Sequence, residues 1–515
     1  MSEDNQMVID SEPEDQELAP VDLPLTSIFA AEPYNLSDFE VEKDGFVARA
    51  DDNRLRYQGY PEDDMLQWQG QQDEMVHLRA LHPELGLWRM DEQRDAYLAI
   101  MEAKNDVIVA IRPGGGKTAL VATVARASPG MVVVVVPLLE LRNQWADVMA
   151  KYGLPAVIFA SAREFDLDPD LHTRSIANQT KVVIVSGDVC AHQPFIDAMV
   201  KLGKTRLFTR IVIDEFHTCY LDQDFRAALA LVYAARSGLP VQLITLSGTV
   251  PTALVEEATK MLCLVTPQVI RSTITRLNIR YSLWPSVKNN AELKQRIQQI
   301  LDSDEWSSFV YDTTYKAEED HYTNDKAFYE SNDKWIIFVP FLDTGKFLAD
   351  TFGLPFYHGS NERTKDTVAP LTTEERRGIL ERWQAEGGGI VGTSAMGAGI
   401  DMRYVSGIIM AGSPMDACTF VQEVDRAGRE DRRALAAIIP DRAPAKRTGR
   451  VAKKLLLKER GLPDIAGYAT IEKLHDGMTE CIRGVLTEHF DDTIRTCSML
   501  AIDDRIRLFE PCSGV

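Results

Sequence analysis

The chain has 515 residues, which is too long for one hydrophobic core and suits two or three domains. Its formal net charge of −21 argues against general nucleic-acid binding, but residues 1–65 hold 18 acidic and 4 basic side chains, so the remainder can still form a local basic groove. No apolar run reaches the roughly eighteen residues of a membrane helix, the acidic N-terminus predicts neither signal nor transit peptide, and seven cysteines without a close pair indicate a reducing compartment.

The predicted elements begin after the acidic N-terminus. Residues 1–75 lack sustained hydrophobic periodicity, and we expect them to be a disordered acidic tail. From about residue 80, helix and strand patterns alternate, which indicates a parallel α/β sheet. The first series predicts strands at 107–111, 132–136, 182–186, 211–213 and 241–246, and helices at 91–104, 118–127 and 139–152.

A second α/β series begins near residue 335. It predicts strands at 335–339, 356–358, 390–393 and 407–411, and helices at 344–352 and 373–386. Between the two series, residues 315–333 are acidic and poor in apolar side chains, which is typical of a surface insertion. The expected organisation is a tail at 1–75, a first α/β domain at 76–270, a linker with the insertion at 271–334, a second α/β domain at 335–440, and a basic, mostly helical C-terminal subdomain at 441–515.

A glycine-rich turn joins the first predicted strand to the following helix. In Gly114-Gly115-Gly116-Lys117-Thr118, the glycines allow backbone N–H groups to surround phosphates. Lys117 can bridge the β and γ phosphates, Thr118 can bind Mg²⁺, and the helix N-terminus adds a partial positive charge. The turn therefore predicts a site for ATP with Mg²⁺.

Charged residues elsewhere in the chain complete the chemistry of phosphoryl transfer. Asp214 and Glu215 follow a predicted strand, where we expect Asp214 to hold Mg²⁺ and Glu215 to orient or deprotonate the attacking water. Arg426 and Arg429, preceded by Gln422, share one helix face. Arginines supplied from outside the phosphate-loop domain can offset charge on the γ-phosphate, so the pattern predicts ATP hydrolysis in a cleft between two domains.

In this order, these elements resemble the superfamily 2 helicases, and most closely the RecQ family, including its divergent fungal members. The resemblance covers about residues 80–440 and, weakly, the C-terminus. The motifs that carry it are Gly114–Thr118, Pro137-Leu138-Leu139, Asp214-Glu215-Phe216-His217, Asp224-Phe225-Arg226, Ser247-Gly248-Thr249, Tyr357-His358-Gly359, Met396–Asp401 and Gln422–Arg429.

The resemblance implies two RecA-like domains that bind ATP and Mg²⁺ between them and move 3′ to 5′ along single-stranded or forked DNA. It assigns adenine contacts to Arg89 and Gln93, and further nucleotide contacts to Gly399 and Asp401. It implies a nuclear protein with no membrane partner. The residues to which it gives catalytic roles are Lys117, Asp214, Glu215, Gln422, Arg426 and Arg429.

The sequence departs from the RecQ pattern at several places. Three residues separate Arg89 from Gln93 where the family usually has two, and Thr218-Cys219-Tyr220-Leu221 lacks the Trp that the family uses to sense DNA. Four single residues depart from the pattern as well. Pro113 stands where the family has Thr, Phe216 and Gly248 each replace an Ala, and Asp425 replaces a Gly beside the arginines. These departures keep open an alternative, namely a catalytically weakened helicase relic that acts as a nucleic-acid-binding or scaffold protein. An RNA helicase is a third interpretation.

The C-terminal cysteines resemble the RecQ zinc subdomain, which needs four ligands. Cys481, Cys497 and Cys512 match three of them, and position 515, where the fourth would stand, is Val. The resemblance therefore implies an incomplete Zn²⁺ site, with His489 as a possible fourth ligand. Three unrelated cysteines are the alternative interpretation.

Overall fold

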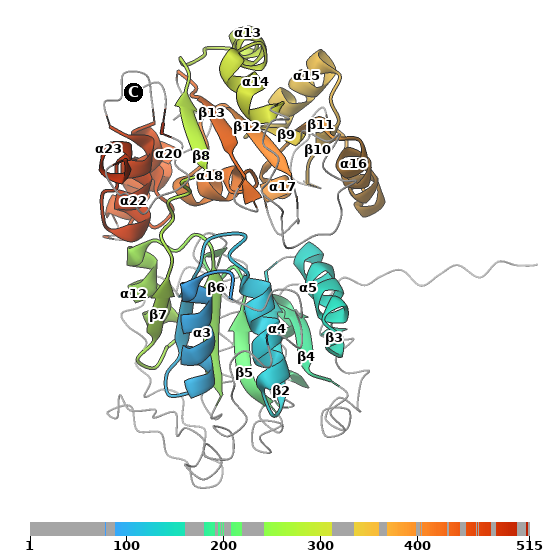
Figure 1. The fold of residues 1–515 in the computed structure, drawn as a ribbon, viewed down its shortest axis with the longest axis vertical. Helices are drawn as coiled ribbons and strands as arrows, with labels where there is room; N and C mark the ends of the chain where they lie inside the picture. Colours follow the sequence, from blue (N-terminus) through green and yellow to red (C-terminus); the bar gives the residue numbers. More distant parts are fainter. Residues whose placement is uncertain are drawn as a thin grey trace, which may run out of the picture. The chain divides into compact units, whose positions relative to one another are not determined.

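The computed structural model (Figure 1) describes part of the compact unit Tyr57–Val515. The described residues are 78, 88–137, 139–159, 180–190, 194–195, 197, 199, 208–218, 241–311, 334–359, 368–397, 402, 404–429, 432–442, 450–459, 461, 463–474, 480–501 and 511–512. The expected tail, the acidic insertion at 315–333, the Asp224-Phe225-Arg226 stretch, Gly399 and Asp401 lie outside them.

A parallel sheet of seven strands forms the first domain. Its strands are β1 (Val107–Ala110), β2 (Met131–Val136), β3 (Ala156–Phe159), β4 (Val182–Ser186), β5 (Phe208–Ile213), β6 (Gln242–Ser247) and β7 (Gln268–Arg271). They are hydrogen-bonded in the order β3-β4-β2-β5-β6-β1-β7. Every residue of β1, β2, β4, β5 and β6 is buried, as expected for parallel strands covered on both faces.

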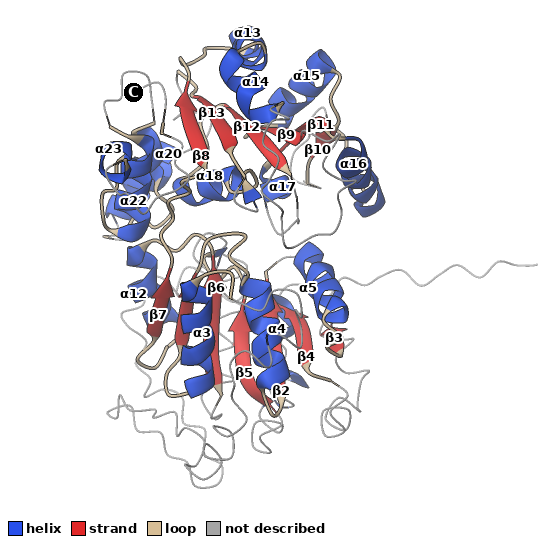
Figure 2. Cartoon of the chain, in the orientation of Figure 1, coloured by secondary structure: helices blue, strands red, loops and turns tan. Residues whose placement is uncertain are grey.

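Helices cover this sheet on both faces (Figure 2). They are α3 (Asp91–Glu102), α4 (Lys117–Ala127), α5 (Leu139–Lys151), α8 (Gly187–Cys190) and α12 (Thr252–Met261). Because side chains alternate along a strand, Val132 and Val134 share one core with α3, α4 and α5, whereas Val133 and Val135 share another with α12. Strand β2, in which five valines follow Met131, is thus apolar on both faces because both are covered.

The second domain has a parallel sheet of six strands. These strands are β8 (Ile279–Leu283), β9 (Lys334–Phe338), β10 (Phe356–Tyr357), β11 (Gly388–Gly392), β12 (Val405–Ala411) and β13 (Ala434–Ile439). Their order is β10-β11-β9-β12-β13-β8. The two sheets confirm the predicted α/β class with two parallel-sheet domains.

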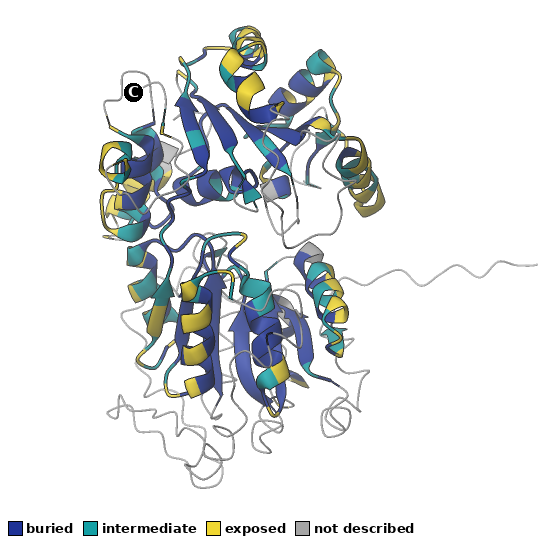
Figure 3. Cartoon of the chain, viewed as in Figure 1, coloured by how far each residue is buried: buried dark blue, intermediate teal, exposed yellow. Residues whose placement is uncertain are grey.

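Helices also cover both faces of the second sheet. The helices from β8 to the C-terminus are α13 (Asn290–Leu301), α14 (Asp304–Val310), α15 (Leu342–Phe352), α16 (Thr373–Glu386), α17 (Ser394–Gly397), α18 (Ala417–Val424), α20 (Arg450–Glu459), α21 (Tyr468–Glu472), α22 (Ile482–Asp491) and α23 (Cys497–Leu500). Helices α13, α14 and α15 share a core with one face, and α16, α18, α21 and α22 share a core with the other. The burial colours follow this division, with exposed residues on the outer side of α13 and α16 (Figure 3).

The second domain extends beyond the boundaries predicted at 335 and 440. Strand β8 pairs with β13, and α13 and α14 pack on the same sheet, although all three lie in the segment expected to be a linker. The alternation of buried Ile279 and Tyr281 with charged Arg280 is too short to indicate an edge strand by itself. At the other end, Ile482, Val485 and Phe490 of α22 enter the core of the second sheet, so the C-terminal helices are part of this domain.

No helix among the described residues is long and apolar enough to cross a membrane.

Candidate nucleotide site

Three motifs of the first domain meet because of strand order. Strands β5, β6 and β1 are neighbours and run parallel, so their carboxyl ends lie along one edge of the sheet. The Gly-rich loop follows β1, Asp214 and Glu215 follow β5, and Ser247-Gly248-Thr249 ends β6. Ligands of parallel α/β sheets bind at such an edge. The candidate site therefore lies at the carboxyl ends of β5, β6 and β1.

The Gly-rich loop is hydrogen-bonded to Gln93, the residue for which the sequence predicts an adenine contact. Gly116 has a φ of 85° and begins α4 as its N-cap, a left-handed conformation that favours glycine. The buried Gln93 donates from Nε2 to the Gly116 carbonyl at 3.0 Å and accepts at Oε1 from the backbone N–H of Arg89 at 2.9 Å. Lys117 donates from Nζ to the Ile111 carbonyl at 3.1 Å. Gln93 therefore lies beside the loop, and the Arg89 side chain is exposed.

The acidic pair after β5 is fixed by three hydrogen bonds. The Asp214 backbone N–H donates to the Val135 carbonyl at 2.9 Å and continues the strand pairing. One carboxylate oxygen of Asp214 accepts from the Glu215 N–H at 3.0 Å, and the other accepts from the indole Nε1–H of Trp145 at 2.7 Å. Glu215 has a φ of 45°, a strained conformation for a residue with a side chain, of the kind that collects at functional sites.

Trp145 is a site residue that the sequence reasoning missed. It lies on α5, is 3% exposed, and is in direct contact with the residue expected to hold Mg²⁺. A buried tryptophan on an amphipathic helix has the sequence pattern of an ordinary core residue. Only its indole N–H, which needs an acceptor when buried, hinted at a polar neighbour.

The two carboxyl groups of the acidic pair have different protonation behaviour. Burial, together with the negative charge of Glu215, raises the pKa of Asp214 to about 6. Burial also acts to raise the pKa of Glu215, but the hydrogen bond from His217 and the positive charge of Lys117 outweigh it and hold that pKa below its usual range. Glu215 is therefore ionised at neutral pH, as a residue that orients or deprotonates water must be.

A hydrogen-bond network joins this edge to the second domain. His217 Nδ1 lies 2.7 Å from Ser247 Oγ and 3.2 Å from Glu215 Oε2, while its Nε2 lies 2.6 Å from Gln422 Nε2. The Gln422 amide also donates to Thr249 Oγ1 at 3.3 Å. Because an amide nitrogen donates, His217 must accept at Nε2, which puts its proton on Nδ1, facing Ser247 and Glu215.

The arginines predicted to complete the site lie next to it. They follow α18 in a tight turn, Asp425 to Arg429, which we call the arginine turn. The Cγ of Arg429 lies 4.0 Å from where a Cβ of Gly114 would stand, and the charge of Arg426 acts on the pKa of Glu215. The structure thus brings together six of the predicted residues, which are Lys117, Asp214, Glu215, Gln422, Arg426 and Arg429. Gly399 and Asp401 lie outside the described residues.

Two departures from the RecQ pattern touch each other. A Cβ on Gly248 would lie 2.5 Å from Cδ and 2.7 Å from Cγ of Pro113, distances at which atoms must move. Gly248 is therefore the residue that fits beside a proline in the Gly-rich loop. The departures at 113 and 248 are one packing solution rather than two independent losses.

The other two single-residue departures are also accommodated. Phe216 is fully buried and belongs to the apolar core beneath the sheet, so its ring adds to the core. Burial raises the pKa of Asp425, and the guanidinium groups of Arg276 and Arg112 oppose that rise. Arg276 lies 3.4 Å from the Asp425 carboxylate, so the buried acid has a cationic partner.

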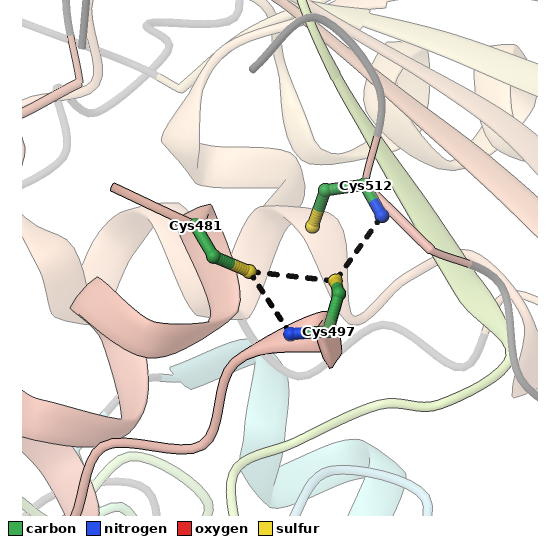
Figure 4. A group of neighbouring side chains, drawn as sticks. All are labelled: Cys481, Cys497 and Cys512. Atoms are coloured by element: carbon green, nitrogen blue, oxygen red, sulfur yellow. Dashed lines mark hydrogen bonds between the residues drawn. The ribbon is translucent and has the colours of Figure 1, made fainter. Parts of the chain in front are cut away.

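The three C-terminal cysteines are close together (Figure 4). Their sulfur atoms lie within 4.8 Å of one another, and Cys481 Sγ is 3.4 Å from Cys497 Sγ. Zn–S bonds of about 2.3 Å in tetrahedral geometry place sulfurs about 3.8 Å apart, so the three thiols fit three corners of a zinc site. His489 is not a fourth ligand, because its Nε2 lies 3.2 Å from the Ile465 carbonyl and no other His, Cys or carboxylate of the described residues joins the cluster.

Comparisons with known proteins match both domains. The DEAD/DEAH box helicase model matches residues 90–258, and the helicase conserved C-terminal domain model matches residues 322–431. ATP-dependent DNA helicase Q1 of Pongo abelii is 22% identical over 396 residues, which cover 76% of this chain and 56% of the relative. RecQ-like DNA helicase BLM of Xenopus laevis is 23% identical over 366 residues, which cover 68% of this chain and 24% of the relative.

The chain is similar to the RecQ-like helicases of superfamily 2, and its two domains match the two helicase domain models. It spans about half or less of the length of these curated relatives. A solved structure of the DEAD-box helicase Mss116 bound to single-stranded RNA and UDP-BeF has a TM-score of 0.52 at 16% identity and covers 86% of this chain and 95% of that chain. This likeness shows that the RecQ-like chain has the two-domain helicase fold.

We expect Trp145→Phe to destabilise the RecQ-like chain in a pH-dependent way. The indole N–H stabilises the ionised form of Asp214, so its loss costs about 1–3 kcal/mol of unfolding free energy above pH 6 and less at pH 5, where the buried carboxyl is protonated. Urea unfolding at pH 5 and pH 8 measures the difference. Trp88→Phe is the matched control, since Trp88 Nε1 is buried without an acceptor among the described residues. Equal effects of Trp145→Phe at both pH values would contradict the role of the hydrogen bond.

We expect Gly248→Ala and Pro113→Ala to be non-additive. Gly248→Ala alone inserts a methyl group against the proline ring and costs about 1–3 kcal/mol of stability. In the Pro113→Ala background the ring is gone, and the same substitution should cost less than half as much. Urea unfolding of the two single variants and the double variant gives the coupling. Strictly additive losses would show that the two positions are not one packing unit.

Proposed function

We propose that the chain is an ATP-dependent DNA helicase or translocase of the RecQ type that moves 3′ to 5′ on single-stranded or forked DNA. The observation that carries the proposal is the approach of the arginine turn to the acidic pair and the Gly-rich loop. A nucleotide bound at the loop would have residues of both domains around its phosphates. Hydrolysis would then change how the domains contact each other.

The residues have complementary roles in this proposal. Lys117 and the loop N–H groups hold the phosphates of ATP, and Thr118 and Asp214 hold Mg²⁺, which neutralises phosphate charge when bound. Glu215, ionised by its bond to His217, orients or deprotonates the attacking water. Arg426 and Arg429 stabilise the charge that develops on the γ-phosphate. Arg89 and Gln93 contact the adenine, and Gly399 and Asp401 contribute further nucleotide contacts.

The network through Gln422 supplies a coupling route between the nucleotide site and the second domain. His217 contacts Glu215, which would face the phosphates of a bound nucleotide, and Gln422, which belongs to the second domain. Ser247 and Thr249 lie in the same network. A change at the γ-phosphate would therefore reach the contact between the domains. Both relatives named above are DNA helicases, which favours DNA as the track and a nuclear location.

The alternative is a weakened relic that binds nucleic acid without coupled hydrolysis. Its specific support is the missing backbone N–H at Pro113, which removes one possible phosphate donor from the loop. The accommodation of Pro113 by Gly248, and of Asp425 by Arg276, argues against decay, because lost function removes the pressure to keep such pairs.

We further propose that Cys481, Cys497 and Cys512 hold Zn²⁺ as a structural ion. The close sulfurs support this role. Arg483 Nη1 donates to Cys497 Sγ at 3.0 Å, which helps to hold that sulfur in the cluster. When bound, the ion would tie α22, α23 and the segment at Cys512 together.

The proposed activity predicts ATP hydrolysis that single-stranded DNA stimulates. Lys117→Ala should abolish it, and Arg426→Ala should lower kcat by about 10³-fold, because an arginine acting on the γ-phosphate is worth about that much. Steady-state phosphate release with DNA, with RNA and without nucleic acid measures this. Hydrolysis no greater than that of Lys117→Ala would refute the proposal and, with DNA binding retained, favour the relic. Stronger stimulation by RNA than by DNA would indicate that the chain moves along RNA.

The zinc proposal predicts about one Zn²⁺ per chain after purification in the absence of chelators. Cys497→Ser should remove most of it, because three ligands are the fewest that common protein sites use. Elemental analysis measures the content directly. Cys263→Ser, at an exposed cysteine outside the cluster, is the control. A metal-free protein from zinc-supplemented cells would show that the cysteines serve another purpose.

A further inference from the structure

The arginine turn contains a buried acid next to one of its arginines. Asp425 directly precedes Arg426, and its side chain is 2% exposed. A carboxylate out of water needs a charge partner or several hydrogen bonds. Its Oδ2 is buried and accepts no hydrogen bond from the described residues, so the partner at Oδ1 carries the compensation.

That partner is Arg276, which lies outside the motifs that carry the RecQ resemblance. Its Nη1 is 3.4 Å from Asp425 Oδ1, and its side chain is 5% exposed. Its Nη2 donates to the carbonyls of Ala427 at 3.4 Å and Gly428 at 2.5 Å. The guanidinium of Arg276 thus contacts the side chain just before Arg426 and both backbone carbonyls of the residues between Arg426 and Arg429.

Asn278, two residues after Arg276, secures the same turn. Its Nδ2 donates to the Gly428 carbonyl at 2.6 Å and to the Arg432 carbonyl at 2.5 Å, while its Oδ1 accepts from Arg276 Nε at 3.3 Å. Gly428 has a φ of 61° and no room for a Cβ, which would lie 2.7 Å from that Nδ2. The segment before β8 therefore fixes the backbone on which both arginines stand.

The C-terminal helix anchors Arg276 in turn. Arg483 of α22 donates from Nη2 to the carbonyls of Arg276 at 3.1 Å and Ile279 at 2.5 Å. Arg483 is itself 1% exposed, and its Nη1 contacts Cys497 Sγ. The backbone of Arg276 is thus attached to the cysteine cluster by one buried side chain.

We propose that Arg276 and Asp425 are a positioning pair that sets the direction of Arg426 and Arg429 toward the nucleotide phosphates. This inference rests on the proposed ATP hydrolysis and deepens it. Arg276 is buried, and its side chain contacts Asp425, Ala427 and Gly428, so it acts through the arginine turn. The pair explains why Asp425 can lie beside Arg426 and Arg429. Its negative charge is compensated by Arg276, and its fixed position orients the arginine turn.

The pair has a kinetic signature that a purely structural role lacks. The arginines act mainly on charge that develops during phosphoryl transfer, so their misplacement lowers kcat more than it raises KM. Removing one member leaves a buried charge without its partner, whereas removing both leaves none. The double variant should therefore be more active than the Arg276 single variant.

The test compares Arg276→Met, Asp425→Asn and the double variant in the 515-residue chain with saturating single-stranded DNA. Arg276→Met should lower kcat by about tenfold or more with KM for ATP within about threefold, and the double variant should regain part of the loss. Affinity for ADP with aluminium fluoride, which mimics the transferring phosphoryl group, should fall with kcat, while affinity for ADP alone is unchanged. Arg280→Met is the matched control, since Arg280 lies on β8 and pairs with Glu305 at 2.7 Å.

The outcomes separate the two proposals. An unchanged kcat in folded Arg276→Met, or equal losses in Arg276→Met and Arg280→Met, overturns the positioning pair. If Arg276→Met does not fold, Arg276→Lys keeps the charge but loses the forked contacts, and the same split between kcat and KM is expected. A wild type that binds ADP but does not hydrolyse ATP refutes the proposed function, while the aluminium fluoride measurement still reports the position of the arginines. A wild type that binds no nucleotide overturns both.

Discussion

The parallel pairing of β5, β6 and β1 is the constraint on which the candidate site depends. It brings three loops that are far apart in sequence to one edge of the first sheet: the Gly-rich loop, the acidic pair and the Ser247–Thr249 segment. The valine-rich strands fix that arrangement because they can be buried only when helices cover both faces. Chemistry at the edge is thus a consequence of packing in the core.

The second domain contributes polar and charged side chains to this edge of the first sheet. Gln422 bonds to His217, and the arginine turn lies beside the Gly-rich loop and Glu215. Three of the charged groups here are buried or half-buried, and each is matched: Asp214 by Trp145, Glu215 by His217 and Asp425 by Arg276. Such pairing is what keeps the charges of a buried site tolerable. It also means that Pro113, Gly248 and Asp425, which depart from the RecQ pattern, each have a neighbour that accounts for them, while Phe216 is enclosed by the core.

Much of this could be predicted from the sequence because the relevant patterns are local. The loop between β1 and α4, the acidic pair at a strand end and the helix at 373–386 are each specified by adjacent residues, and the structure places the six predicted site residues together. What escaped prediction depends on contacts between distant segments. Trp145 meets Asp214 across 69 positions, and Arg276 meets Asp425 across 149. Strand β8 was assigned to a linker because an edge strand with a charged centre has no strong pattern, and its place is decided by β13.

The central claim is that the second domain completes the nucleotide site of the first. The most direct measurement is an experimental structure of the chain with ADP, Mg²⁺ and beryllium fluoride, a mimic of ATP. The account predicts that the fluoride group lies within hydrogen-bond distance of Lys117 from one domain and of Arg426 or Arg429 from the other, with Glu215 facing the site of the attacking water. A nucleotide held by the Gly-rich loop alone, with both arginines turned away from the phosphates, would contradict it.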